Sequence, residues 1–432
     1  MQSNKINMPI EFTVQPIKQG VVVLGSAYWF SVEVAAKEIV GGYYECYNHD
    51  QPWKGAAMIN IDLIDTQSKV DVNRYINLPF RLYEGSPLWV PPIIMDIKTR
   101  LNREKHPFHE HSDVEFLIAE RDGVDVGRIA VIENKPYNQF HEKRQAQFYF
   151  FESIEDFDVA RALFEWAFEW AKERGLNQVV GPKGFGPLDG YGMLVKGYEF
   201  RPAMTMMNYN PPHYPEFVEK LGFRKEVDFV SCYLSAAKFR LPERVHRIAE
   251  RAAKRSGLSV KRFRNKRELM NWAARIGKTY NDTFVNNWEY YPLSQREIDY
   301  VVSEILTVAD PRFIKIILHE ENVVGFLFGF ADVSAAIQRS KGRLFPFGII
   351  DIMIEMKRTK WAALNGAGVL PEFQGRGGNA LLYSEMEKTV HEFDFQHADL
   401  TQVAESAVQM RQDLEIVGGE AYKNHRVFIR DI

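Results

Sequence analysis

A glycine-rich segment near the C-terminus, Gln374-Gly-Arg-Gly-Gly-Asn-Ala380, has the residue types of an anion-binding loop. Glycines allow positive φ and let the backbone approach a ligand closely. Apolar spacing predicts a helix from about Ala380 to Phe393, so the loop lies at a helix N-terminus, where free N–H groups and the helix dipole favour negative charge. With the added charge of Arg376, the segment predicts a pyrophosphate cradle. A glycine turn that only caps the helix is the structural alternative.

Three known sequence patterns of phosphate-binding loops could account for this segment. A P-loop requires Gly-Lys-Ser or Gly-Lys-Thr at the helix start, and the segment contains neither. Gly375-Arg-Gly-Gly-Asn-Ala fits the relaxed dinucleotide-binding pattern G-x-G-x-x-A. Asp399 falls near the distance in sequence at which that pattern has its acidic residue. However, Asp399 would open the next strand instead of closing it, and too little chain follows for a doubly wound sheet. The third pattern is Gln/Arg-x-x-Gly-x-Gly/Ala after a strand that ends in Val-x-Pro.

Val369-Leu-Pro-Glu-Phe-Gln-Gly-Arg-Gly matches the third pattern and resembles the GNAT acyltransferase superfamily. In that superfamily the loop holds the coenzyme A pyrophosphate, and a strand bulge opens a gap for the pantetheine. Asn379 departs from the usual last glycine or alanine of the motif, so its Cβ would crowd the pyrophosphate and weaken or alter binding. The resemblance implies that acetyl-CoA or another acyl-CoA is bound by Gly368, Val369, Gln374, Gly375, Arg376, Gly377, Gly378 and Asn379.

The catalytic groups are less clearly marked. GNAT proteins typically transfer the acyl group directly from thioester to amine, with a base, an acid and a backbone N–H that polarises the carbonyl. Leu414 stands at the position of the usual acid, a tyrosine, and Ala407 at that of the usual asparagine. Water, Tyr383 or Tyr422 would have to replace the acid. Glu405 is the candidate base, and a carboxylate that only complements the helix dipole is the alternative.

From Met58 onward the chain contains the same coarse unit twice. Residues 114–132 and 313–330 each predict two strands joined by a tight turn. Amphipathic helices follow at about 159–174 and 380–393, and each half closes with a glycine-terminated helix and a strand, at 227–234 and 421–429. We predict an α+β fold of two tandem GNAT-like domains, 58–235 and 236–432, each with a mixed, mostly antiparallel sheet flanked by helices.

The tandem arrangement resembles the bacterial two-domain GNAT proteins of the BcerS-like group, with Leu88-Trp-Val-Pro-Pro and Tyr209-Asn-Pro-Pro-His-Tyr in the first half. That half has no glycine cradle, because the acidic segment 151–158 stands in its place and would repel an anion. We expect it to bind no coenzyme A and to shape the acceptor cleft. Residues 181–192 would line that cleft or form an ordinary surface loop, and residues 286–292 would cover the acceptor or only pack aromatic rings.

Two further clusters of chemically active residues have simple alternatives. His106, His109 and His111 have metal-ligand types, but no carboxylate pattern completes a site, so we expect no metal. The basic helical stretch 244–255 is either a solvated surface or a region that attracts an anionic ligand.

Composition limits the remaining classes. The 432 residues are 46% hydrophobic and 26% charged, as in globular domains. The net charge of −3 gives no general argument for nucleic acid or a membrane as partner, and we expect neither. Cys46 and Cys232 make neither a disulfide framework nor a zinc site, which favours a reducing cytoplasm. The apolar run 20–32 is too short to span a bilayer. Residues 1–57 show no clear period, and we expect an N-terminal appendage outside the main fold.

The sequence therefore predicts a cytoplasmic, acyl-CoA-dependent N-acyltransferase, with acetyl-CoA as the expected donor and an unidentified amine as acceptor. Two alternatives remain open. A non-catalytic acyl-CoA-binding protein is favoured by Leu414 and Ala407. A FemABX-like aminoacyl transferase would also pair two GNAT folds and would take aminoacyl-tRNA, but such proteins usually lack the glycine loop.

Overall fold

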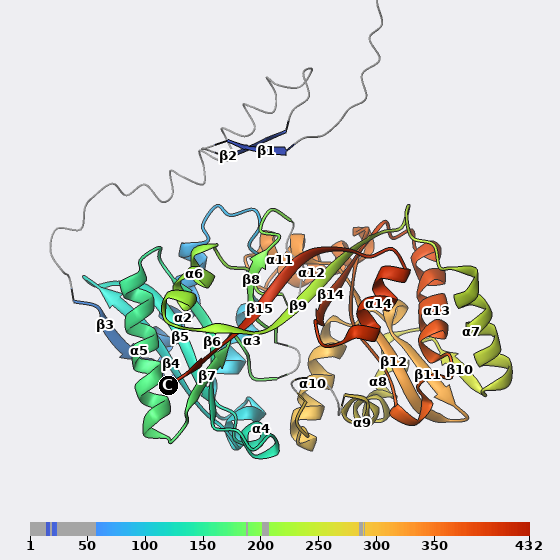
Figure 1. Cartoon of the computed structure of the whole chain (residues 1–432), viewed down its shortest axis with the longest axis horizontal. Coiled ribbons are helices and arrows are strands. Elements are labelled where there is room, and N and C mark those ends of the chain that lie inside the picture. The colour runs from blue at the N-terminus through green and yellow to red at the C-terminus, as the bar shows by residue number, and fades with distance from the viewer. Residues whose placement is uncertain are drawn as a thin grey trace, which may run out of the picture. The chain divides into compact units, whose positions relative to one another are not determined.

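The computed structural model of the chain describes residues 14–17, 20–23, 58–186, 189–200, 207–284, 288 and 290–432. The chain forms two compact units, residues 1–57 with 85–87, and residues 58–84 with 88–432. In the first unit, β1 (Val14–Ile17) pairs antiparallel with β2 (Gly20–Val23). The rest of the predicted appendage lies outside the described residues. All other elements belong to the second unit, whose residues up to 235 and from 236 are called the first and second halves (Figure 1).

The elements of the first half follow the predicted order, and the helix predicted at 159–174 is observed as α5. Its N-cap residue is Asp156, whose side chain accepts a hydrogen bond from the backbone N–H of Asp158. The elements are β3 (Asn60–Leu63), α2 (Lys69–Leu82), α3 (Ile94–Leu101), the 3₁₀ turn η1 (Pro107–Glu110), β4 (Asp113–Arg121), β5 (Val124–Glu133), α4 (Lys135–Phe140), β6 (Gln145–Ser153), α5 (Phe157–Glu173), β7 (Gln178–Gly181), β8 (Met193–Lys196), α6 (His213–Lys220) and β9 (Arg224–Ser235).

The second half repeats the hairpin, the following strand and the covering helix. The helix predicted at 380–393 is observed as α13. The elements are α7 (Glu243–Arg255), β10 (Leu258–Lys261), α8 (Lys266–Met270), α9 (Ala273–Thr283), α10 (Gln295–Val308), η2 (Pro311–Phe313), β11 (Lys315–His319), β12 (Asn322–Ala331), α11 (Ser334–Ser340), α12 (Gly348–Arg358), β13 (Trp361–Val369), η3 (Pro371–Phe373), α13 (Gly378–Glu392), β14 (His397–Ala404), α14 (Val408–Ile416) and β15 (Glu420–Asp431).

The strands of both halves join in one sheet, which has thirteen strands in the described residues. The order is β10-β11-β12-β13-β14-β9-β15-β7-β6-β5-β4-β3, with β8 beside β15. Most neighbours are antiparallel, and the parallel pairs are β6 with β7 and β13 with β14. The sheet is thus mixed and mostly antiparallel, as predicted. Because it continues through both halves, the predicted domain boundary at 235/236 stays a prediction.

The two halves exchange their last strands. β9 closes the first half in sequence but pairs with β14 of the second half. β15 closes the second half but pairs with β7 and β8 of the first. The two exchanged strands also pair with each other. In Figure 1 the red β15 runs from the second half into the first, where the C-terminus lies. Each half therefore needs a strand from the other to complete its sheet.

Each half has its own apolar core. In the first, α5 packs Phe164 against Phe148 of β6, with ring centroids 5.0 Å apart, and the exchanged strand contributes the fully buried Phe428. In the second, α13 packs the fully buried Leu382 in a cluster that contains Phe313. Burial of one such side chain stabilises the fold by about 1.5–3 kcal/mol. The cores hold α5 and α13 in corresponding places on the two halves.

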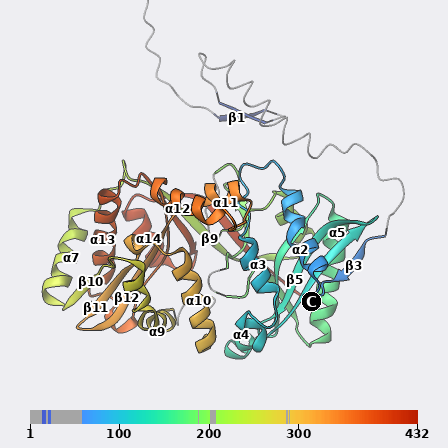
Figure 2. The same ribbon diagram turned by 180° about the vertical axis from the view of Figure 1, so that it is seen from behind.

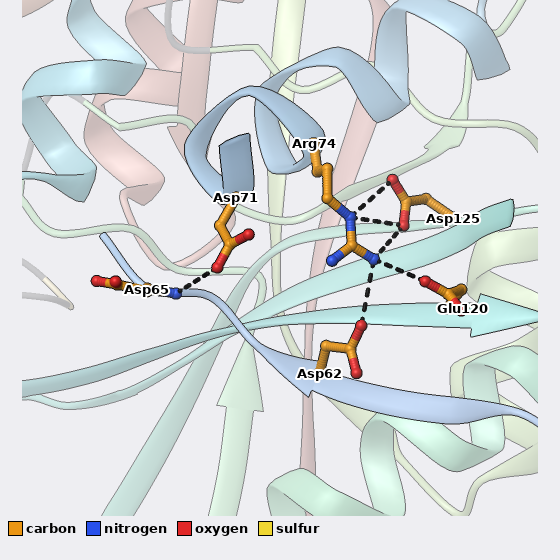
Figure 3. A network of polar contacts seen from close by, with 6 residues as sticks. All are labelled: Asp62, Asp65, Asp71, Arg74, Glu120 and Asp125. Atoms are coloured by element: carbon orange, nitrogen blue, oxygen red, sulfur yellow. Dashed lines mark hydrogen bonds and ion pairs between the residues drawn. The ribbon is translucent and has the colours of Figure 1, made fainter. Parts of the chain in front are cut away.

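An ion-pair network ties α2 to the sheet edge of the first half. Arg74 of α2 lies 2.6 Å from Asp125, 3.1 Å from Glu120 and 3.2 Å from Asp62. Figure 3 shows the guanidinium between these three carboxylates, which come from β5, β4 and β3. The network joins three strands through one partly exposed side chain, so it orients α2 more than it stabilises the fold.

Candidate functional site

The predicted cradle is a tight loop between β13 and α13. Gly375 and Gly377 have φ of 73° and 89°, in the left-handed region that favours glycine. Gly377 is the N-cap of α13. A Cβ at Gly377 would lie 2.9 Å from the Cβ of Ala252 on α7, whereas a Cβ at Gly375 would meet nothing within 4 Å. Gly377 is therefore required by packing, and Gly375 faces open space.

The loop presents unpaired backbone donors. Among the described residues, the N–H groups of residues 375–380 have no backbone acceptor, and the first helix-closing bond runs from Leu381 N–H to the carbonyl of Gly377. These groups lie at the positive end of the α13 dipole. The exposed Arg376 guanidinium lies 4.9 Å from the centre of the Phe373 ring. The cradle thus fits a pyrophosphate by free donors, dipole and charge together.

Two polar residues of the motif turn toward the protein. Gln374 donates from Nε2 to the carbonyl of Val369 at 3.1 Å, which closes the loop onto the end of β13. Asn379 donates from Nδ2 to Asp413 of α14 at 3.5 Å. The amide of Asn379 therefore points to α14, and the predicted crowding of the pyrophosphate by this residue stays untested.

A bulge in β13 opens the sheet beside the cradle. Leu327 of β12 pairs with Ala367, but Gly329 pairs with Leu364, so Asn365 and Gly366 together face a single residue. The parallel pairing of β13 with β14 ends at Leu364 opposite Leu400. Beyond this pair the two strands diverge, which is the gap that the GNAT resemblance implies. The residues that line it are 365–367; the predicted contacts of Gly368 and Val369 with pantetheine stay untested.

A cavity of about 720 Å³ fills this gap. Such a volume lies within the range of about 300–1,000 Å³ that is usual for ligand sites. Most of its wall is apolar or aromatic and comes from β9, α9, β12, α13, β14 and the 181–192 loop. Its aromatic lining consists of Phe185, Tyr191, Phe229, Phe239, Tyr280, Phe284, Trp288, Tyr290, Tyr291, Phe328, Phe330, Tyr383 and Phe395.

The residues in the usual acid positions line this cavity with apolar side chains. Both Leu414 and Ala407 border it, so neither supplies a proton. Of the two tyrosines proposed as substitutes, Tyr383 borders the cavity, and its hydroxyl donates to Asp413 at 3.1 Å. Burial raises the pKa of Tyr383 far above its usual value, so it stays protonated. The hydroxyl of Tyr422 donates instead to Asp399.

Glu405, the predicted base, lies in an ion-pair cluster. Its carboxylate accepts from Lys225 Nζ at 2.7 Å and from the backbone N–H of Asp228 at 3.1 Å. The residues on both sides of it, Ala404 and Ser406, border the cavity, but Glu405 does not. This geometry gives no support to a role in proton transfer, and the assignment stays an untested prediction.

The first half repeats the bulge and the gap with other residues. Arg128 of β5 pairs with Glu152, but Ala130 pairs with Tyr149, so Phe150 and Phe151 form the bulge. The parallel pairing of β6 with β7 likewise ends, at Gln147 opposite Val180. By this register Glu152 stands where the second half has Ala367. A smaller pocket of about 280 Å³ lies here.

Buried charges fill the first half's gap. Glu152 lies 3.6 Å from Arg128 and accepts hydrogen bonds from the hydroxyls of Tyr83 at 2.7 Å and Tyr214 at 3.0 Å. Burial raises the pKa of Glu152, and the nearby Arg128 opposes that shift. His425 of β15, fully buried beside the same pocket, donates from Nε2 to a backbone carbonyl. This network pairs most of its polar groups inside the protein, and Arg128 Nε and His425 Nδ1 have no hydrogen-bond partner in the described part of the chain.

The helix that corresponds to α13 has an occupied N-terminus. Besides capping α5, Asp156 forms an ion pair with the buried Arg121 at 2.7 Å. A carboxylate there complements the helix dipole and repels an anionic ligand. The segment that the sequence analysis singled out as acidic thus supplies the N-cap, which supports the expectation that this half binds no coenzyme A.

The three histidines point to different partners. His109 contacts the carbonyl of Arg100 at 2.8 Å, His111 contacts Glu297 of α10 at 3.0 Å, and His106 lies against Tyr300 of α10 with ring centroids 4.6 Å apart. Within the described residues, no group of three His, Cys, Asp or Glu side chains could hold a metal ion. His106 and His111 thus join the two halves, and His109 contacts its own half.

The sequence analysis named the 181–192 loop but not its chemically important member. Lys183 is buried and borders the cavity, and its ammonium lies 4.0 Å from the centre of the Tyr137 ring and 5.3 Å from that of Trp288. Gln402 was also missed: its side chain pairs with the backbone N–H and carbonyl of Tyr191 and so fixes the loop to β14. The order Gly-Pro-Lys-Gly was the available signal for Lys183. Of residues 286–292, only 288 and 290–292 are described.

Comparisons with known proteins agree with this architecture. No family model matches the chain. It is 27% identical over 382 residues to the bacterial ceramide synthase of Caulobacter vibrioides, covering 85% of this chain and 97% of that protein. It is 24% identical over 371 residues to protein YghO of Escherichia coli, covering 84% and 94%.

The fold comparison supports the same conclusion. A tandem GNAT protein from the clavulanic acid biosynthesis pathway superposes with a TM-score of 0.52 at 12% identity, over 87% of this chain and 98% of that one. The bulge and the splayed strand pair in each half of the sheet, the glycine cradle in the second half and this match confirm the predicted fold class. In fold and over most of its sequence, the chain resembles the tandem proteins of the GNAT acyltransferase superfamily.

Proposed function

We propose that the protein transfers a long acyl group from acyl-CoA to the amine of an apolar acceptor. The observation that carries the proposal is a mostly apolar cavity of about 720 Å³ that is lined in part by β13 and α13, the strand and helix on either side of the cradle. An acetyl group would occupy a small part of that cavity, so its walls favour a long chain on the donor, the acceptor or both. Acetyl-CoA, the donor expected from sequence, is therefore the less favoured donor.

The cradle would bind the anionic end of the donor. The free N–H groups of residues 375–380 and the exposed Arg376 lie beside α7, whose exposed basic residues include Arg251, Lys254 and Arg255. These charges support binding of the several phosphates of coenzyme A. The pantetheine and thioester would then enter between β13 and β14, where pairing stops at Leu364.

The reaction forms one C–N bond and breaks one C–S bond. The acceptor amine attacks the thioester carbonyl, the amine loses a proton, and the thiolate of coenzyme A gains one. Of the two tyrosines proposed from sequence, Tyr383 borders the cavity and its hydroxyl stays protonated, so it is our candidate for the acid. We propose that Lys183, which lies over two aromatic rings and borders the cavity, contacts the acceptor.

The relatives support the chemistry of the acceptor. The bacterial ceramide synthase matches over nearly its whole length. A ceramide is the amide of a fatty acid with a long-chain amino alcohol, so one large apolar cavity suits such a reaction. We propose a long-chain amino alcohol as the acceptor class, and the cytoplasm, where acyl-CoA is available, as the compartment.

Calorimetry with palmitoyl-CoA and acetyl-CoA tests the donor site. We expect palmitoyl-CoA to bind more tightly, and Arg376→Glu to weaken both about tenfold or more, because a charge-assisted contact is lost. The matched control, Arg267→Glu, reverses an equally exposed charge on α8 of the same half. Failure of the folded wild-type protein to bind either thioester contradicts the proposal.

Turnover is tested separately, by thiol release and by mass spectrometry of the amide formed from sphinganine. We expect the palmitoyl amide to form faster than the acetyl amide. Equal rates for the two donors would refute the assignment of a long acyl group while leaving N-acyl transfer in place.

A second candidate, binding of acyl-CoA without catalysis, is favoured by one observation: Leu414 and Ala407 put apolar side chains where the superfamily usually has its acid and asparagine. It predicts tight acyl-CoA binding and no amide with any amine. If only the acid is missing, Leu414→Tyr restores turnover, and that result would separate an inactive enzyme from a binding protein.

A further inference from the structure

The helix α12 and the turn before it expose a continuous row of large apolar side chains. Phe345 and Phe347 are 70% and 75% exposed, and Met353 is 57% exposed. On the helix, Ile349, Ile350, Met353 and Ile354 lie at the spacing of one face, and all four are exposed. Single exposed apolar residues need no explanation, but a contiguous patch of this kind marks an interaction surface.

The opposite side of α12 is fixed in place. Ile352 and Met356 pack on the apolar cluster of Phe330, Val333 and Ile337. A third stripe carries Asp351 and Glu355, which both pair with Arg339 of α11, at 2.8 and 2.5 Å. Figures 1 and 2 show α11 and α12 side by side. Because the apolar cluster and the ion pairs with Arg339 fix the rotation of α12, the exposed apolar row faces away from the protein.

Basic residues flank the apolar row. Lys341 and Arg343 precede α12, and Lys357 and Arg358 end it. All four are exposed, and none forms an ion pair with a described residue. The two carboxylates of the helix, Asp351 and Glu355, both pair with Arg339, and these five cations and two carboxylates together leave a local charge of +3. The surface thus combines outward apolar side chains with unpaired positive charge.

We propose that this α12 surface docks the protein onto a membrane that contains anionic lipids. A helix with an apolar face and basic residues beside it lies in the membrane interface, with the apolar residues among the acyl chains and the cations at the headgroups. The eleven residues of α12 are too few to cross a bilayer, and in the described residues no helix is long and apolar enough to do so. Docking is therefore peripheral.

The whole-chain charge conceals this feature. The sequence analysis expected no membrane partner because the net charge is −3. The relevant charge is local, however, because screening limits electrostatic attraction to about 8 Å at physiological salt. The cations within one turn of the apolar row therefore determine how strongly this surface is attracted to an anionic one.

The docking surface lies one layer from the cavity. Phe330, beneath α12, also borders the cavity, and so does Ile305 of α10, which packs on the same cluster. Membrane docking goes beyond the transfer reaction proposed above and does not depend on it. It would place the apolar cavity close to the source of apolar substrates.

Vesicle flotation of the full-length protein tests the inference. We expect binding to vesicles of phosphatidylcholine and phosphatidylglycerol in equal parts, much weaker binding to phosphatidylcholine alone, and a loss of binding between about 0.1 M and about 1 M salt. No binding of the wild-type protein to the anionic vesicles overturns the inference.

Paired variants locate the surface. Phe347→Ser with Met353→Ser should lower vesicle affinity at least tenfold, whereas Val70→Ser with Met270→Ser, which removes side chains of similar exposure on α2 and α8, should leave it unchanged. Lys357→Gln and Arg358→Gln should each lower affinity about fivefold, since each charge near an anionic surface contributes about 1 kcal/mol. Near-ultraviolet circular dichroism checks that all variants are folded.

Two other occupants of the surface give distinct results. If a second copy covers it, Phe347→Ser with Met353→Ser converts a dimer to a monomer in sedimentation and leaves flotation unchanged. If residues 1–57 cover it, the full-length protein does not float but a variant lacking those residues does. A protein partner would leave vesicle binding insensitive to the variants. Each of these outcomes overturns membrane docking by the intact chain.

Discussion

The two halves carry the same bulge at the same register, but the residues that re-enter the ladder differ. In the second half Asn365, Gly366 and Ala367 leave the gap open to a large apolar cavity. In the first half Phe150, Phe151 and Glu152 fill it with rings and a buried charge. One backbone frame thus supports either a ligand cavity or an internal polar network, and side-chain size at the bulge decides between them.

The N-termini of α5 and α13 show the same choice. Gly377 caps α13 without a side chain and leaves its N–H groups free, whereas Asp156 caps α5 with a carboxylate that also pairs with Arg121. A helix N-terminus either stabilises the fold through its own cap or remains available to an external anion. The protein uses one option in each half.

Replacing the buried acid tests the comparison most strongly. Glu152→Ala gives the first half the residue type of Ala367 and removes the carboxylate that Arg128, Tyr83 and Tyr214 share. We expect the free energy of unfolding to fall by about 3–5 kcal/mol, measured in urea, and acyl-CoA affinity to stay unchanged. Glu152→Gln keeps an acceptor and should cost less. A gain of acyl-CoA binding in the first half would mean that the acid, not the whole pocket, separates the halves.

Adding a carboxylate to the cradle should convert it to the first half's type. A Cβ at Gly375 meets no atom within 4 Å, so Gly375→Asp and Gly375→Asn are both sterically allowed, and both residue types tolerate positive φ. We expect Gly375→Asp to bind acyl-CoA about a hundredfold more weakly than Gly375→Asn, because only Asp repels the pyrophosphate. Equal affinities in calorimetry would place the pyrophosphate elsewhere.

Removing the negative charge from the N-cap of α5 tests the comparison of the two helix N-termini in the first half. Asp156→Asn keeps an acceptor for the Asp158 N–H but removes the negative charge that pairs with the buried Arg121. The free energy of unfolding should fall by about 2 kcal/mol. Acyl-CoA affinity and stoichiometry should remain those of the wild type. A second equivalent of acyl-CoA bound would show that this carboxylate alone closes the first half to the ligand.

The exchanged strand carries a pH-sensitive group into the first half. Burial lowers the pKa of His425 to about 4, from an ordinary value near 6.5. Between pH 6.5 and 4 the unfolded state binds a proton at His425 that the folded state does not. The contribution of His425 to the free energy of unfolding is therefore fully present above pH 6.5 and declines as the pH falls toward 4. His425 should contribute about 1.4 kcal/mol of this decline per pH unit. His425→Gln should lower the slope of unfolding free energy between pH 6.5 and 5; an unchanged slope would contradict the assignment.

Sequence patterns foretold the elements whose signal is local. The hairpins, the helices near 159–174 and 380–393, and the glycine loop all follow from periodicity and residue type over short windows. The bulge was expected only through the family resemblance. Its position at Asn365–Gly366, three residues before Gly368, depends on the pairing of β12 with β13, and pairing is not local.

Strand neighbours and buried polar groups escaped prediction for the same reason. The segments of β9 and β15 were recognised as strands, but nothing in their alternation says that each pairs with the other half. The sequence indicated that Glu152 belongs to an acidic loop. Arg128, Tyr83 and Tyr214 are distant in sequence and come close to it only in the folded chain. Residue 405 was chosen from chain position at a strand end, and its ion pair with Lys225, 180 residues away in sequence, was invisible there.

The strand exchange also sets the order of events during synthesis. The first half leaves the ribosome first, but β7 and β8 gain their neighbour only when β15 has been made, after the entire second half. Until then β7 is an unpaired edge, and the place of Phe428 in the first half's core is vacant. The nascent first half must remain incomplete and open to pairing with other chains. Its protection during translation is thus a requirement that the topology of the mature protein imposes on the cell.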